Sequence, residues 1–73
     1  MSGWISVKDG FPPGFKEVLI YRRNGDIAIA YHSSNQKLWY FTVNPNMWIT
    51  DDMEHFWSVI AWRPLPEPYK EEL

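Results

Sequence analysis

The dipeptide Asn24-Gly25 constrains the fold more than any other feature of the sequence, because it separates two strand-like runs. These runs cover residues 17–22 and 27–32 and are rich in aliphatic and aromatic side chains. Asn-Gly between such runs is the strongest short-range signal for a β-hairpin, since a type I′ turn requires positive φ at both central residues. The sequence therefore predicts an antiparallel hairpin and excludes a helix from this part of the chain.

The length of the turn decides which face of this hairpin is buried. With a two-residue loop at Asn24-Gly25, the numbers of opposite residues sum to 49, so Glu17 faces His32. A three-residue loop with a bulge would exchange the two faces. With the two-residue loop, the predicted core face carries Val18, Ile20, Ile27, Ile29 and Tyr31, and the opposite face, a shallow trough, carries Leu19, Tyr21, Ala28 and Ala30.

Three further segments have the composition of strands, at residues 4–7, 38–43 and 58–62. Acidic residues early in the segment 51–57 favour a single helical turn there. The prolines from Pro64 to Pro68 favour an extended strap over a paired strand. The predicted fold is mainly β: a small antiparallel sheet of about four to five strands, with the central Asn-Gly hairpin, one short helical turn near 51–57 and a proline-rich C-terminal strap.

Length and composition indicate one domain, residues 1–73, with a frayed tail at 69–73. The chain has no cysteine, so aromatic residues, 18% of the chain, must supply most of the core. We expect at least three of the five tryptophans to be buried. Trp48 should be the most exposed of them, because the breakers Asn44-Pro45-Asn46 make its segment the least regular.

Charge and hydropathy limit the classes of partner. The net charge is −2, and Arg22-Arg23 is the only adjacent basic pair, so we expect no nucleic-acid ligand. No apolar run reaches the 18–20 or so residues of a membrane span. The N-terminus lacks the pattern of a secretory signal. We expect a cytoplasmic protein that has no membrane partner.

Two groups of polar residues could carry chemistry, and each has a simpler explanation. Asp51, Asp52, Glu54 and His55 match no known metal-ligand spacing and fit a solvated helix start. The predicted pair of Glu17 with His32 lacks a nucleophile in an activating motif and fits cross-strand charge pairing. The sequence therefore predicts no catalytic residues, no metal and no cofactor, and the protein is not expected to be an enzyme.

Both ends of the chain carry a recognisable pattern. The chain opens with Trp4-Ile5-Ser6-Val7 before Pro12 and closes with Trp62-Arg63-Pro64-Leu65-Pro66-Glu67-Pro68. Over residues 4–68 it resembles the domain-of-unknown-function family 551, which comprises short proteins carried mostly by bacteriophages and prophages. The histidine that precedes the closing tryptophan in that family is Ala61 here, so no role of that histidine transfers. The resemblance implies a phage or prophage source and a compact β-rich domain, and it implies no established activity.

The leading hypothesis is a small phage-type accessory protein that binds a host or phage protein, or a second copy of itself, and perturbs the partner's activity. In the host this would take place in the cytoplasm. Exposed aromatic residues in an irregular segment are typical of protein interfaces. The predicted partner-binding residues are Met47, Trp48, Asp51, Asp52, Met53, Phe56 and Trp57. The alternative is a small-ligand or glycan binding module that stacks a ring on Trp or Tyr, with Gln36, Asn44 and Asn46 as polar contacts.

Overall fold

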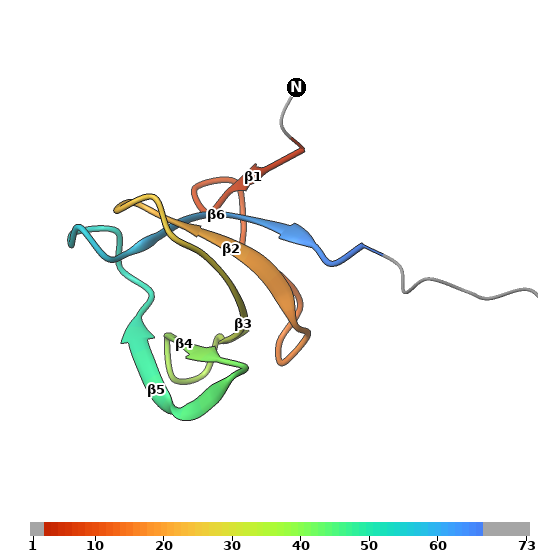
Figure 1. Ribbon diagram of the computed structural model, residues 1–73, viewed down its shortest axis with the longest axis vertical. Coiled ribbons are helices and arrows are strands. Elements are labelled where there is room, and N and C mark those ends of the chain that lie inside the picture. Colours follow the sequence, from red (N-terminus) through yellow and green to blue (C-terminus); the bar gives the residue numbers. More distant parts are fainter. Residues whose placement is uncertain (1–2, 67–73) are drawn as a thin grey trace, which may run out of the picture.

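A computed structural model describes residues 3–66 and shows one strongly twisted antiparallel sheet (Figure 1). The strands lie in the spatial order β1-β6-β2-β3-β4-β5, so that β1 and β5 form the two edges. Their bounds are β1 (Ile5–Ser6), β2 (Val18–Arg22), β3 (Ile27–Ser33), β4 (Leu38–Phe41), β5 (Asn44–Thr50) and β6 (Val59–Pro64).

The mainly β prediction is confirmed, with two differences in the elements. The predicted helical turn is wrong: residues 51–58 form bends and turns, and the described part of the chain contains no helix. A further strand, β5, occupies the segment for which the sequence predicts irregular structure. Pro45 is compatible with β5 because this strand lies at the edge of the sheet, where a missing N–H group need not cost a ladder hydrogen bond.

The hairpin of β2 and β3 exists, but its loop has three residues rather than two. Gly25 has φ 95°, its N–H donates to the Arg22 carbonyl at 2.9 Å, and the Arg22 N–H donates to the Asp26 carbonyl at 2.9 Å. Opposite residue numbers therefore sum to 48, as in Val18 with Ala30. This is the geometry of a turn followed by a bulge at a left-handed glycine.

The change of one residue in register turns the residues of β3 to the opposite face from the one predicted, while those of β2 keep theirs. The predicted burial of Val18 and Ile20 is confirmed, whereas the predicted faces of the β3 residues are wrong. Ala28 and Ala30 face the interior together with Val18 and Ile20, whereas Ile27 and Ile29 are exposed on the other side. We call these two sides the inner and the outer face of the sheet. Larger residues contributed by other elements fill the space above the alanines.

The core lies on the inner face and is covered by loops. Phe11 stacks on the buried His32 ring, with centroids 4.2 Å apart, and Met53 packs against the core from the segment that follows β5. The Trp62 indole N–H donates to the Gly10 carbonyl at 2.9 Å, which ties the first loop to β6. The buried apolar residues are Val7, Val18, Ile20, Ala30, Trp39, Phe41 and Val59.

The tryptophans are less buried than expected. Among the five, only Trp39 is fully buried, so the prediction of three or more is wrong. The core is covered by loops, which leave large side chains partly exposed to solvent, whereas a second sheet would bury them. The exposure predicted for Trp48 is confirmed, at 54%.

The C-terminal strap is shorter than predicted, because β6 continues through Pro64, which pairs with Val18. The remainder of the predicted strap and the predicted frayed tail, residues 67–73, lie outside the described residues.

Candidate functional site

Four aromatic rings on or beside the outer face form a row that crosses three strands. Tyr31 of β3 pairs with Tyr40 of β4, and Tyr40 pairs with Trp48 of β5, so all three side chains leave the sheet on the same side. The Tyr31 and Tyr40 rings stack with centroids 5.4 Å apart and planes at 21°. Phe15, in the loop before β2, extends the row with its ring 5.8 Å from that of Tyr31. We call Phe15, Tyr31, Tyr40 and Trp48 the aromatic row.

The aromatic row is open to solvent at both ends. Phe15 is 67% exposed and Trp48 is 54% exposed, while the two tyrosines between them are half-buried. Strand-to-strand contacts within residues 3–66 join only neighbours within the sheet, so no second layer of strands covers this face. A large exposed cluster of aromatic rings is the kind of surface that marks binding sites.

The backbone at Phe15 is held in an unfavourable conformation. Its φ is 61°, in the left-handed region that normally favours glycine. Two hydrogen bonds fix this geometry: the Phe15 N–H donates to the His32 carbonyl at 3.1 Å, and the Lys16 N–H donates to the Pro13 carbonyl at 3.3 Å. The strain, on the order of 1 kcal/mol, therefore accompanies a side chain that buries little of its own surface.

Beneath the sheet, His32 pairs with Asp51 and not with Glu17. The His32 side chain is almost fully buried, and its Nε2 lies 2.9 Å from Asp51 Oδ2. The predicted pairing with Glu17 is wrong, because the register shift turns His32 inward while Glu17 lies on the exposed outer side. Asp51 also donates its backbone N–H to the Lys37 carbonyl at 3.0 Å. Asp51 therefore anchors the end of β5 to the core.

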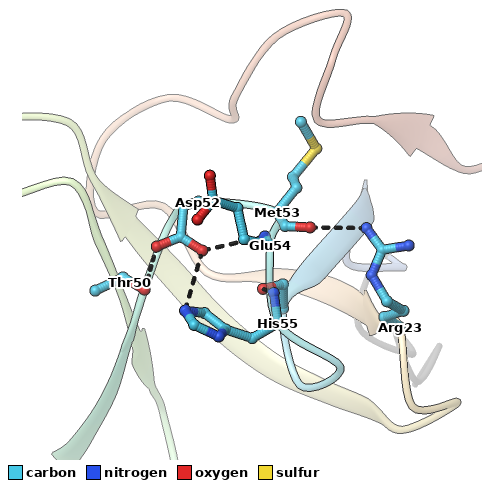
Figure 2. Close-up of polar contacts among 7 residues, drawn as sticks. Arg23, Thr50, Asp52, Met53, Glu54 and His55 are labelled. Carbon is cyan, nitrogen blue, oxygen red and sulfur yellow. Dashed lines mark hydrogen bonds and ion pairs between the residues drawn. The ribbon is translucent and has the colours of Figure 1, made fainter.

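Asp52 is the centre of a local polar network (Figure 2). Its carboxylate accepts hydrogen bonds from the Thr50 hydroxyl at 2.9 Å and from the Glu54 backbone N–H at 3.2 Å, and His55 Nε2 lies 3.6 Å away. The backbone N–H of Glu54, then the Thr50 hydroxyl, and then the charge of His55 lower the pKa of the Asp52 carboxyl below the ordinary 3.8. Desolvation acts in the opposite direction and is outweighed by these interactions, since the side chain is 41% exposed.

The lowered pKa predicts how this loop responds to acid. A carboxyl whose pKa falls on folding stabilises the folded state above its unfolded pKa, and this contribution is lost as pH falls through the folded value. NMR titration of the Asp52 carboxyl should give a midpoint below 3.8. The Asp52→Asn variant should lose less stability than the wild type on acidification below pH 4 or so. A midpoint at or above the ordinary value would contradict the network.

The loop after β5 is fixed to the tip of the hairpin by two arginines. The Arg23 guanidinium donates to the Met53 carbonyl at 2.9 Å (Figure 2), and Arg22 Nε donates to the Trp57 carbonyl at 2.8 Å. Phe56, at 67% exposure, lies edge-on to Trp57 with centroids 5.3 Å apart. The loop therefore presents a second, smaller aromatic surface beside the hairpin tip.

The structure thus divides the predicted partner-binding residues among different environments. Met47 and Trp48 are exposed on the edge strand β5, and only Trp48 belongs to the aromatic row. Asp51 contacts the buried His32 and Met53 packs against the core, whereas Asp52 accepts hydrogen bonds within the loop after β5. Phe56 and Trp57 form the surface beside the hairpin.

Sequence reasoning missed Phe15, Tyr31 and Tyr40. A two-residue turn places Tyr31 in the core, and the three-residue turn that the structure contains places it on the outer face. Tyr40 pairs directly with Tyr31, so the same turn exposes it. The positive φ of Phe15 cannot be predicted from the sequence. Glycine adopts positive φ more readily than other residues, so the sequence favours this conformation at the neighbouring Gly14 instead.

The described residues form no pocket, and residues 3–66 contain no group of three or more acidic or histidine side chains arranged to hold a metal ion. The same part of the chain has no helix that could cross a membrane.

Comparison with known proteins adds one match. The sequence model of a family described as "Protein of unknown function (DUF551)" matches residues 3–70, nearly the whole chain. No curated protein and no solved structure matches the chain.

Proposed function

The chain belongs to the DUF551 family, and we propose that it is a small phage- or prophage-type accessory protein that acts by binding another protein, without catalysis. The observation that carries this proposal is the aromatic row, whose two ends are more than half exposed on an uncovered sheet face. The partner is a host or phage protein whose activity the binding modulates.

The two tyrosines at the centre of the aromatic row are held in place without a partner. Tyr31 and Tyr40 hold one another by stacking, and the Tyr40 hydroxyl donates a hydrogen bond to the Gln36 side chain. Rings that are already fixed lose little conformational entropy on binding, which raises affinity for a given contact area. Tyr and Trp are also the residues most enriched at interface hot spots.

The strain at Phe15 supports the same proposal. The backbone conformation at Phe15 is unfavourable, and the exposed ring that it positions adds little to the stability of the folded protein. Strained residues cluster where function requires a particular placement of a side chain. Contact of the Phe15 ring with a partner would account for its position.

The acidic residues after β5 contribute a charged rim next to Trp48. Asp52 and Glu54 are solvent-accessible, and both follow the strand that carries the end of the aromatic row. Such a rim steers a basic partner surface toward the site and makes association slower at high salt. Met47 and Phe56, before and after these acids in the sequence, are also exposed.

The test is retention of a protein from host lysate by the immobilised chain, followed by quantitative binding of that protein. Phe15→Gly should weaken binding by about 30-fold, which corresponds to roughly 2 kcal/mol for a hot-spot ring. The same variant should keep its free energy of unfolding within about 1 kcal/mol of the wild type, because relief of strain offsets the lost ring contact.

Ile27→Ser is the matched control, because Ile27 is 58% exposed on the same face but lies outside the aromatic row. It should leave binding within about twofold of the wild type. Weakening by Phe56→Ala but not by Phe15→Gly would move the contact to the loop beside the hairpin. Absence of any retained protein would contradict the proposed function.

A further inference from the structure

The two edges of the sheet differ in how far they are open to another strand. Within the described residues, β1 has only two residues, whereas β5 has seven. Natural proteins protect edge strands by keeping them short or by placing lysines, prolines or bulges on them, because an open edge pairs with other strands. The β1 edge is protected by its length. The β5 edge has no charged residue from Asn44 to Thr50.

The N–H groups of β5 are available only in its second half, so the first half can contribute only carbonyl acceptors to a ladder with another strand. Pro45 has no N–H group, and the N–H of Asn46 donates to the Asn44 side chain at 3.3 Å. Asp51 donates its N–H inward to Lys37 of the β3–β4 connection. In an antiparallel ladder the direction of these groups alternates along the strand, so the peptide groups of Trp48 and Thr50 point to the open side.

We propose that β5 pairs antiparallel with β5 of a second copy of the chain, with Trp48 opposite Trp48 of the second copy. The inference rests on the proposed function only in taking the aromatic row as an interface. In this pairing the second copy covers the open β5 edge, and the two sheets become one continuous sheet.

This register suits the charges and the side chains. Opposite residue numbers sum to 96, which places Met47 beside Ile49 of the second copy and Asn46 beside Thr50. Asp51 and Asp52 then lie opposite Pro45 and Asn44, so no carboxylate faces another. A parallel arrangement would align the acids of both copies, and like charges directly opposite are destabilising.

The same register makes the aromatic row continuous. Residues directly opposite one another leave a sheet on the same face, so the two Trp48 rings meet on the outer face. The row then runs from Phe15 of one copy to Phe15 of the other. The contact uses the same strand of both copies, so it is closed by a two-fold axis. A dimer therefore forms, and no longer assembly.

Sedimentation of the full chain should show a mass about twice 8.7 kDa that falls on dilution. Trp48→Lys should give a folded monomer, since it places a charge at the centre of the contact. Ile27→Lys is the control: Ile27 has similar exposure on the same face, two strands away from β5, and this variant should remain a dimer. Loss of the dimer in Ile27→Lys but not in Trp48→Lys would overturn the pairing.

A second measurement uses the absence of cysteine in the chain. Trp48→Cys should form a disulfide-linked dimer under mild oxidation, because hydrogen-bonded partners have Cα atoms about 5.5 Å apart, within the range of about 4.4–6.8 Å for disulfides. Thr50→Cys is the matched control on the same edge, where its copy would be about 13 Å away along the strand. Equal cross-linking of both variants would overturn the register.

The outcomes separate this inference from the proposed function. A wild-type chain that stays monomeric up to roughly 1 mM, yet retains a lysate protein through Phe15, overturns the pairing and leaves the proposed function intact. A dimer that depends on Trp48, in a chain that retains no other protein, supports the pairing and contradicts the proposed function.

Discussion

Replacing His32 with alanine is expected to lower the free energy of unfolding by about 3 kcal/mol or more. The imidazole is stacked on Phe11 at 4.2 Å, lies 5.0 Å from the Trp39 ring, and contacts the Asp51 carboxylate at 2.9 Å. Its loss opens a cavity beside the largest core residue and leaves the Asp51 carboxylate without its partner. Because small domains are only marginally stable, chemical denaturation should show a large fraction of the variant unfolded in buffer.

His55→Ala is the matched control. His55 also lies beside an aspartate, at 3.6 Å from Asp52, and also stacks on an aromatic ring, that of Trp57. It is 41% exposed, however, so its removal should cost less than about 1 kcal/mol. Equal losses in the two variants would show that burial of the His32 pair has no structural importance.

Ala30→Lys is expected to unfold the domain, whereas Ile29→Lys should leave it folded. Ala30 is fully buried on the inner face opposite Phe41, so a lysine there places an unpaired charge in the core, at a cost of roughly 3 kcal/mol or more. Ile29 is 38% exposed on the outer face, where a lysine can reach solvent at a cost of about 1 kcal/mol.

This pair of variants tests the register that exposes the aromatic row. With a two-residue loop the outcome would be reversed, because Ile29 would face the core and Ala30 the trough. Circular dichroism and thermal unfolding of both proteins decide between the two registers. If the Ala30→Lys variant folds and the Ile29→Lys variant does not, Tyr31 faces the core and the aromatic row does not exist as an exposed surface.

The sequence predicted the β class, the hairpin and the exposure of Trp48, because these depend on local signals. Strand composition and the Asn-Gly dipeptide act over a few residues. The register was not predictable in the same way. Gly25 suits both a two-residue turn and a three-residue turn with a bulge, and the choice depends on what packs against each face.

The errors about the site follow from that one residue of register. Large residues at Ile27 and Ile29 suggested a core face, whereas the sheet uses Ala28 and Ala30 inside and fills the space with Trp39 and Phe41 from β4. His32 then meets Asp51, a contact over 19 residues of sequence separation that no local pattern encodes. Residues 44–50 form a strand because they pair with the edge of β4. This tertiary contact outweighs the local preference of Asn44-Pro45-Asn46 for irregular structure.

The aromatic row is the surface through which we propose that this protein binds another. The most direct measurement is an NMR spectrum of the labelled chain with and without the protein it retains from host lysate. We expect the largest changes at the Trp48 indole N–H and at the amides of Tyr31 and Tyr40, with small changes at Ile27 on the same face. Changes confined to residues 53–57, with the signals of the aromatic row unmoved, would contradict the claim.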